Sequence, residues 1–228
     1  MNIVAFAACA SMCLPILQAQ AHGLAPAPVG YRVADSTPTT SVAIQTVSVD
    51  AVAGMPRKAV VHVNAILKAA AAGFANEAKQ CGAAAQGRPW GYKLAFDKVL
   101  VSHAYLSVVF AKSTVCAGSP DEEKEARVFA LKTGELVPAR ALFKQMLPSA
   151  TIMPSITKNK ELIRLDEQTA ETLIDDSKLL LNIDDERCDF YLKNGSYRIW
   201  VEGKNLVFFP EFIQPYSFCQ TEYLIKPE

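Results

Sequence analysis

The sequence has no excess of charge of either sign, because 23 lysines and arginines balance 23 aspartates and glutamates among 228 residues. This balance gives no general attraction to nucleic acid or to an anionic membrane surface. After the N-terminus we find no stretch that is long and apolar enough to predict a bilayer-spanning helix. The length fits one domain, or one domain with a tail, and the 50% apolar content is enough for a sizeable core.

The sequence also lacks the patterns that mark common cofactor, metal and catalytic sites. It has no internal repeat, no glycine-rich phosphate loop and no Cys-x-x-Cys pair. His62 has no second ligand-type residue one helical turn away, so we expect a surface or half-buried histidine. Asp97 and His103 lie in or beside a predicted hairpin without a nucleophile elbow, so we interpret them as structural. We therefore expect no cofactor, no metal and no enzymatic activity.

The N-terminus carries the pattern of an export signal. Residues 3–17 are almost continuously apolar, and the small-x-small sequence Ala19-Gln20-Ala21 follows, which is typical of a secretory signal peptide. The first two residues supply no lysine or arginine. A buried helix is the other interpretation, but Pro15 and the loop-like segment after it argue against it. Cys13 suggests a lipoprotein, but the residue directly before it is not small. We expect a periplasmic or secreted protein, with a Gram-negative periplasm favoured.

Cleavage after residue 21 leaves four cysteines, Cys81, Cys116, Cys188 and Cys219. An even number in an exported chain indicates two disulfides, and four cysteines allow three pairings. We favour Cys81–Cys116 and Cys188–Cys219, because each bridge links neighbouring segments of one half of the chain. Each bridge would stabilise the fold by about 2–4 kcal/mol.

Composition divides the chain into three parts. Residues 1–21 are the predicted signal peptide, and residues 22–40, which are rich in proline and small polar residues, are predicted to be a flexible leader. Residues 41–228 are predicted to form a single domain. We predict an α+β fold, in which an antiparallel sheet packs against one long N-terminal helix and shorter later helices.

The first half of this domain has clear periodicity. Residues 41–49 alternate as a strand, and Pro56 begins a helix whose apolar residues recur at three- and four-residue steps until Cys81-Gly82. Glycine there suits the helix C-terminal cap. Alternating residues over 90–100 and 104–111 predict a hairpin.

The second half predicts short helices followed by strands. We expect two short helices over 155–176, because the apolar pattern is interrupted. Residues 188–192 are predicted to pair with residues 196–201 across Lys193-Asn194-Gly195, since Asn-Gly is a strong hairpin signal. Gly203-Lys204-Asn205 is predicted to be a second turn. The many aromatic residues near the C-terminus are more typical of a packed core than of a ligand groove.

The middle of the chain, residues 127–143, is interpreted as a structural hinge with a turn at Lys132-Thr133-Gly134 and an apolar pair at Leu142-Phe143. An acidic run precedes it, and its members Asp121, Glu122, Glu123 and Glu125 are our candidate binding residues. Calcium is disfavoured, since the alternating oxygen-ligand spacing with a central glycine is absent. A solvated loop or strand edge is the favoured structural interpretation.

Several motifs in this order resemble a known family. They are Val63-Asn64 in the helix, Ser107-Val108-Val109-Phe110, Leu131-Lys132-Thr133-Gly134-Glu135-Leu136, Leu142-Phe143 and residues 208–216. Over residues 40–226 the chain resembles the exported domain family found in the lysozyme-sensing anti-sigma factor RsiV and before the catalytic domain of the peptidoglycan deacetylase PdaC. The resemblance implies an α+β domain of an envelope protein. The family often has a Gly-Gly-Ala-His type turn where this chain has Ala117-Gly118-Ser119-Pro120, so lysozyme binding is not carried over residue by residue.

These observations predict a non-catalytic binding module that recognises an envelope protein, a lysozyme-like protein included, or a cell-wall glycan. The acidic run is a plausible contact for a basic partner. One alternative is a peptidoglycan hydrolase, which would need two carboxylates at a cleft, for example among Glu122, Glu123, Asp184 and Glu186. The other alternative is a structural envelope domain without a defined ligand.

Overall fold

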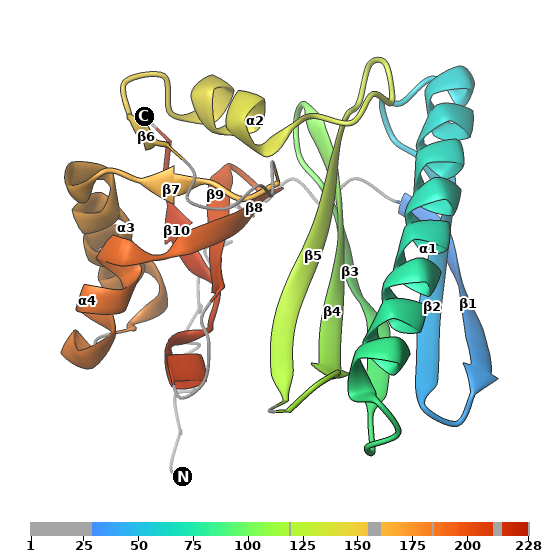
Figure 1. The fold of residues 1–228 in the computed structure, drawn as a ribbon. Coiled ribbons are helices and arrows are strands. Elements are labelled where there is room, and N and C mark those ends of the chain that lie inside the picture. Colours follow the sequence, from blue (N-terminus) through green and yellow to red (C-terminus); the bar gives the residue numbers. More distant parts are fainter. Residues whose placement is uncertain (1–28, 119, 155–160, 184, 212–215, 228) are drawn as a thin grey trace, which may run out of the picture.

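The computed structural model describes residues 29–118, 120–154, 161–183, 185–211 and 216–227, which form two halves (Figure 1). The predicted signal peptide lies outside these residues. The N-terminal half contains β1 (Val29–Thr39), β2 (Val42–Val52), α1 (Arg57–Ala85), β3 (Gly91–Val101), β4 (Tyr105–Val115) and β5 (Asp121–Ala130). The C-terminal half contains α2 (Ala139–Met146), β6 (Ile152–Met153), β7 (Arg164–Leu165), α3 (Glu167–Leu181), α4 (Glu186–Asn194), β8 (Ser196–Glu202), β9 (Asn205–Glu211), the 3-10 helix η1 (Tyr216–Cys219) and β10 (Tyr223–Ile225).

The N-terminal half is a five-stranded sheet in the order β1-β2-β3-β4-β5, with α1 lying across one face (Figure 1). All neighbours are antiparallel except β2 and β3, which pair in parallel over Val42–Ile44. α1 connects these two strands, and a helical crossover allows them to run in the same direction. The predicted α+β class is therefore confirmed. The sheet is mixed rather than antiparallel, and its helix follows two strands.

The sequence predicted α1 well at its start and less well at its end. Pro56 precedes the first helical residue, and buried residues of the helix pack on the sheet, including Val63, Leu67 and Phe74. The helix continues past Gly82 to Ala85. Gly82 is therefore not the cap, which is Gln86 in a left-handed conformation. A Cβ on Gly82 would lie 2.7 Å from the Trp90 ring, so the missing side chain allows the ring to pack closely against the helix.

By length and composition α1 could also span a membrane, a feature that we did not anticipate from the sequence. Its apolar face packs on the five-stranded sheet, and Val63 and Phe74 belong to the core between helix and sheet. Cys81, near its C-terminus, is bonded to Cys116 directly after β4. These contacts make α1 the core helix of the N-terminal half.

The predicted flexible leader was wrong over Val29–Thr39, which form β1 and pair with β2. All but the first residue of this strand are exposed, so the strand has no alternating apolar pattern that could have revealed it. Arg32 donates to Asp50 at 2.7 Å across the pair.

The C-terminal half is built on a three-stranded antiparallel sheet in the order β10-β9-β8. The predicted turn at Gly203 joins β8 to β9, whereas the predicted hairpin at Asn194-Gly195 was wrong. Residues 186–194 form α4 instead, because Cys188 and Leu192, four positions apart, are both buried on one helical face. Cys188 is bonded to Cys219, so both disulfides have the pairing that we favoured.

The predicted pair of short helices over 155–176 was only partly right. Residues 155–160 lie outside the described part of the chain, and Arg164–Leu165 is the short strand β7. One helix, α3, begins at Glu167, and its N-terminal cap is Asp166, whose carboxylate accepts from the backbone N–H of Thr169 at 2.9 Å.

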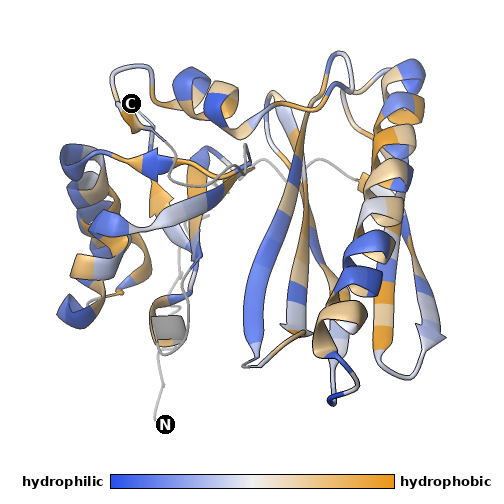
Figure 2. Cartoon of the chain, viewed as in Figure 1, coloured by the Kyte–Doolittle hydropathy of each residue, from blue (hydrophilic) through white to orange (hydrophobic). Residues whose placement is uncertain are grey.

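Each half has its own core, and the open face of the five-stranded sheet joins them. Val109 and Val128 belong to the core of the C-terminal half, whereas Val108 and Phe129 belong to the core beneath α1. The alternation along β4 and β5 thus serves both cores. β5 is hydrophilic along much of its length (Figure 2), and this polar edge leads to the site described next.

Candidate functional site

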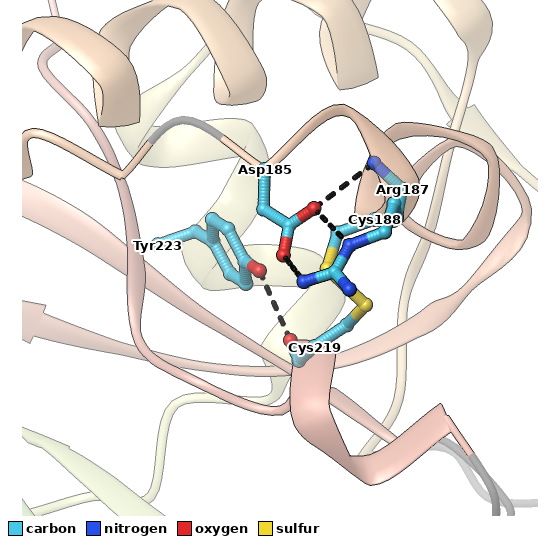
Figure 3. Close-up of a disulfide and its surroundings, with 5 residues drawn as sticks. All are labelled: Asp185, Arg187, Cys188, Cys219 and Tyr223. Atoms are coloured by element: carbon cyan, nitrogen blue, oxygen red, sulfur yellow. Dashed lines mark hydrogen bonds and ion pairs between the residues drawn. A yellow bond between two sulfur atoms is a disulfide. The ribbon is translucent and has the colours of Figure 1, made fainter.

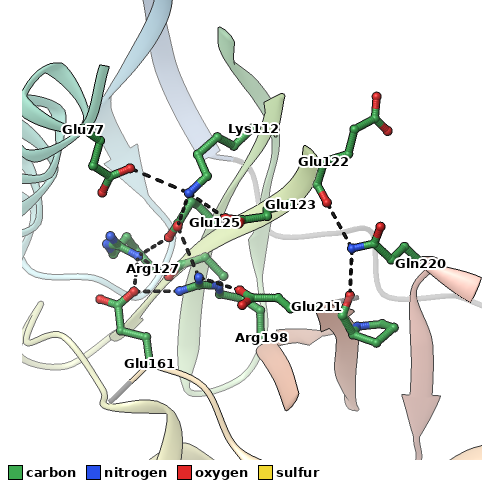
Figure 4. A network of polar contacts seen from close by, with 12 residues as sticks. Glu77, Lys112, Glu122, Glu123, Glu125, Arg127, Glu161, Arg198, Glu211 and Gln220 are labelled. Atoms are coloured by element: carbon green, nitrogen blue, oxygen red, sulfur yellow. Dashed lines mark hydrogen bonds and ion pairs between the residues drawn. The ribbon is translucent and has the colours of Figure 1, made fainter. Parts of the chain in front are cut away.

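A network of ion pairs crosses the boundary between the two halves (Figure 4). We call it the junction network, and its members are Glu77 of α1, Lys112 of β4, Glu123, Glu125 and Arg127 of β5, Glu161, Arg198 of β8 and Glu211 of β9. It brings together residues from five helices and strands, so it forms only when the two halves are docked.

Arg198 is the centre of this network. Its side chain is only 3% exposed, and its guanidinium lies 2.7 Å from Glu161, 2.8 Å from Glu211 and 3.2 Å from Glu125. A buried guanidinium is tolerated when carboxylates match its charge and its donors. Its Nε atom nevertheless has no hydrogen-bond partner among the described residues, so one buried donor is unsatisfied.

Glu125 is the buried anion of the network. Its side chain is 6% exposed, and it lies 3.1 Å from Arg127 and 3.4 Å from Lys112 as well as near Arg198. Burial raises the pKa of its carboxyl, but the charges of Arg198, Arg127 and Lys112 together outweigh burial, so the pKa is lowered. Glu125 is therefore held ionised in the folded protein.

Glu211 behaves in the opposite way. Burial raises the pKa of its carboxyl by more than the nearby charge of Arg198 lowers it, and the charges of Glu123 and Glu125 raise it further. The same network therefore holds one carboxyl whose pKa is lowered and one whose pKa is raised.

A cavity of about 250 Å³ opens beside this network. We call it the arginine cavity, and it is lined by Ala126, Arg127, Val128, Leu136, Val137, Pro138, Ala139, Leu142, Glu161, Arg198 and Ile199. Two arginines and one glutamate are its charged residues, and the other lining residues are apolar. Most of the lining comes from the segment 126–142, where β5 passes into α2, so the predicted hinge forms the wall of the site.

Glu161 closes the polar side of the arginine cavity. Its Oε2 atom accepts from Nη1 of Arg127 at 3.1 Å and from Nη1 of Arg198 at 2.7 Å. Its side chain is 45% exposed, which makes it far more accessible than Glu125. One carboxylate oxygen thus bridges two guanidiniums at the border between protein and solvent.

The predicted acidic run lies on β5, the edge strand next to this cavity. Glu122 is its exposed member, and the backbone oxygen of Glu122 accepts from Gln220 (Figure 4). Glu123 pairs with Lys112 at 2.6 Å, and Glu125 is buried. Burial raises the pKa of Asp121, and so does the neighbouring Glu123. The edge-strand interpretation was right, but much of the negative charge of the run is matched inside the protein.

Two of the carboxylates considered for a hydrolase, Glu122 and Glu123, line one cavity of about 300 Å³ together with Lys112 and Lys124. They are neighbours on β5, and Glu123 is paired with Lys112 at 2.6 Å. Glu186 lies on α4 in the other half, and Asp184 lies outside the described residues. The two residues considered as a catalytic pair are separate as well, because Asp97 pairs with Lys124, whereas His103 lies in the turn before β4.

The second disulfide has polar groups around it (Figure 3). The hydroxyl of Tyr223 donates to the backbone oxygen of Cys219 at 3.0 Å, and Asp185 accepts from the side chain of Arg187. Burial raises the pKa of Tyr223 to about 12, with smaller contributions from Asp185 and Asp189. The disulfide joins α4 to η1, and none of these residues lines the arginine cavity.

Sequence reasoning missed the two arginines and Glu161. Arg198 stands among the apolar residues of β8, Tyr-Arg-Ile-Trp-Val, which is an unusual place for a charge. A charged residue inside an apolar strand was the one feature of the sequence that could have pointed to Arg198. The positions of Arg127 and Glu161 carried no comparable signal, because their partners are distant in the sequence.

One solved structure of another protein is weakly similar to this chain. No family model matches the chain, and no curated protein matches it. The crystal structure of a DUF3298 family member from Bacteroides fragilis is similar, with a TM-score of 0.45 and 8% sequence identity, over 88% of this chain and 91% of that chain. At this TM-score and identity the similarity establishes neither a family nor a function, and the resemblance to RsiV and PdaC remains an expectation from the motifs.

Proposed function

We propose that the chain is an exported, non-catalytic binding module of the cell envelope, and that the arginine cavity is its recognition site. In this proposal the protein is periplasmic or secreted, and it recognises an envelope protein, a lysozyme-like protein included, or a cell-wall glycan. The two disulfides are typical of an oxidising compartment outside the cytoplasm, and the apolar N-terminus supports export.

The observation that carries the proposal is the composition of the arginine cavity. Apolar walls with a few convergent polar groups are typical of binding sites. Here the charged groups are two guanidiniums and the carboxylate of Glu161, which pairs with both of them. The fold holds the guanidiniums in place, because Arg198 is anchored by Glu125 and Glu211 and Arg127 is anchored by Glu125. A rigid, partly desolvated pair of cations favours recognition of a negatively charged group.

Binding is favoured over acid–base catalysis by the state of the carboxylates. A general acid needs a raised pKa and a position next to its substrate. Glu125 has a lowered pKa, and Glu211 is engaged by Arg198 on the buried side of the network. The acidic run is not the contact that we favour for a basic partner, since Lys112, Arg127 and Arg198 match its charge.

The test measures binding of purified lysozyme and of soluble peptidoglycan fragments by calorimetry. Leu136→Trp should block the arginine cavity, because Leu136 lines it and is 39% exposed. Leu180→Trp is the matched control, because Leu180 is 43% exposed on α3. We expect one ligand class to bind, with at least about a tenfold loss in the first variant and no change in the second. The proposal would be contradicted if the protein bound neither ligand class, or if both variants bound equally well. Cleavage of the peptidoglycan fragments by the protein would also contradict it.

A further inference from the structure

We propose that the arginine cavity is a carboxylate-binding site, in which the side chain of Glu161 occupies the place of a ligand's carboxylate. This inference rests on the binding function proposed above and specifies its chemistry. The ligand is a carboxylate attached to a small apolar group, as at the C-terminal residue of a peptide.

The first argument is the geometry of the two guanidiniums. Nη1 of Arg127 and Nη1 of Arg198 converge on a single oxygen of Glu161, at 3.1 Å and 2.7 Å. The position of that oxygen is therefore defined by two charge-assisted hydrogen bonds from two strands, β5 and β8. Guanidiniums match the planar geometry of a carboxylate, so a ligand carboxylate fits the place that Glu161 fills.

The second argument is that the three glutamates that pair with Arg198 differ in how far their side chains are exposed to solvent. The side chain of Glu161 is 45% exposed, compared with 21% for Glu211 and 6% for Glu125. Displacing an ionised side chain costs least where water can solvate it again. Glu161 is thus the partner that a ligand replaces, while Glu125 and Glu211 continue to anchor the arginine.

The third argument is the size and polarity of the remaining walls. Val128 and Leu142 are buried, whereas Leu136 and Pro138 of the lining are exposed. The volume of about 250 Å³ is smaller than that of pockets for drug-sized ligands, which begin at about 300 Å³. The part of the ligand that enters the cavity is therefore a carboxylate with one small apolar side chain.

The experiment compares N-acetylalanine with its amide, N-acetylalaninamide, by NMR titration of the full chain. These probes have the same size and differ in charge. We expect the acid to shift resonances of the residues lining the arginine cavity and the amide to leave them unchanged. Glu161→Gln should strengthen binding of the acid by about tenfold, because it removes the competing negative charge and keeps the size of the side chain. Glu186→Gln, at an exposed position on α4, is the matched control and should leave the affinity unchanged.

Arg127→Gln should weaken binding of the acid by about tenfold or more, with the melting temperature checked in parallel. If that variant does not fold, the Glu161→Gln comparison still decides the question. Equal binding of acid and amide overturns the inference, and so does an unchanged affinity in Glu161→Gln. Inorganic phosphate that binds more tightly than the acid overturns the carboxylate class. If lysozyme or peptidoglycan fragments bind in a manner that Leu136→Trp abolishes, while the acid does not bind, the proposed function stands and this inference fails.

Discussion

Gly134 lies so close to Ala59 that no side chain fits between them. A Cβ on Gly134 would stand 2.9 Å from the Cα of Ala59 and closer still to its carbonyl oxygen. Gly134 also has a φ of +73°, a conformation that side chains rarely adopt. The turn at Lys132-Thr133-Gly134 therefore packs directly against the first turn of α1. This contact fixes the start of the segment that forms the wall of the arginine cavity.

We predict that Gly134→Ala lowers the free energy of unfolding by more than about 3 kcal/mol, because it adds a steric clash with α1 to the backbone strain. Gly203→Ala is the matched control, since Gly203 has a φ of +61° and open space around its Cβ position. It should cost only the strain, about 1–2 kcal/mol. Urea denaturation of the two variants checks this, and equal losses would contradict the importance of the contact.

The pKa of Glu125 predicts how stability depends on pH. A carboxyl whose pKa is lowered on folding contributes stability above its unfolded pKa, here 4.5, and the contribution is lost as the pH falls through the folded value. Glu125→Gln should therefore destabilise the protein at neutral pH by about 3–5 kcal/mol, because two arginines lose a buried partner. The free energy of unfolding of this variant should also fall less between neutral and acidic pH than that of the parent protein.

Glu122→Gln is the control for this prediction, because Glu122 is the exposed carboxylate of the same strand. A surface substitution of this kind should change stability by less than about 0.5 kcal/mol. Urea titrations from about pH 3 to about pH 8 measure both variants. A Glu125→Gln variant with the same pH profile as the parent protein would show that the carboxyl is not held ionised by its neighbours.

Glu211 predicts the opposite pH dependence. Its pKa is raised on folding, so its contribution is fully present below the unfolded pKa of 4.5 and is lost as the pH rises through the folded value. Glu211→Gln keeps a neutral side chain at every pH. The variant should therefore gain stability relative to the parent protein as the pH rises above about 4.5. The same urea titrations measure this, and a variant that becomes relatively less stable with rising pH would contradict it.

The elements that could be predicted best from the sequence are those with one buried face and with partners that lie close in the chain. α1 was found because its apolar residues recur at helical spacing, and the disulfides were found because each links segments close in the chain. β1 was missed because an exposed edge strand has no buried face to impose alternation. The Asn-Gly signal failed at residues 194–195 because burial of Cys188 and Leu192 favoured a helix over a strand.

The candidate site could be predicted only in part, because its contacts are distant in the sequence. Arg198 meets Glu125 across 73 positions and Glu161 across 37 positions. No spacing rule links such residues, so the sequence revealed the acidic run and not the cations that match it. The run was recognised as notable for its charge, and the fold shows that this charge serves the junction between the halves.

The two disulfides should stabilise the protein to a similar extent, because they close loops of similar length, with sequence separations of 35 and 31. Replacing either pair by serines should lower the free energy of unfolding by about 2–4 kcal/mol. The two losses should be similar if the effect comes mainly from the unfolded chain. Denaturation of the two double variants checks this, and a loss confined to one of them would show that local contacts dominate.

Ser107 provides a direct contact between β4 and β8, and it offers the sharpest test of how the halves are docked. Its hydroxyl donates to the backbone oxygen of Val201 at 3.0 Å and accepts from the backbone N–H of Val201 at 3.2 Å. Ser107 is fully buried, so Ser107→Ala would leave both backbone groups without their partner. We predict a loss of about 1–3 kcal/mol for each unsatisfied group.

Ser113→Ala, on the same strand but partly exposed, is the control and should have little effect. Hydrogen exchange at the Val201 amide adds a local measurement, because the amide should exchange faster in Ser107→Ala. Unchanged exchange in that variant would mean that β8 stays docked without the hydroxyl. The ion pairs of Lys98 with Glu202 and Glu222 would then hold β8 against the five-stranded sheet, because they bridge the same two layers.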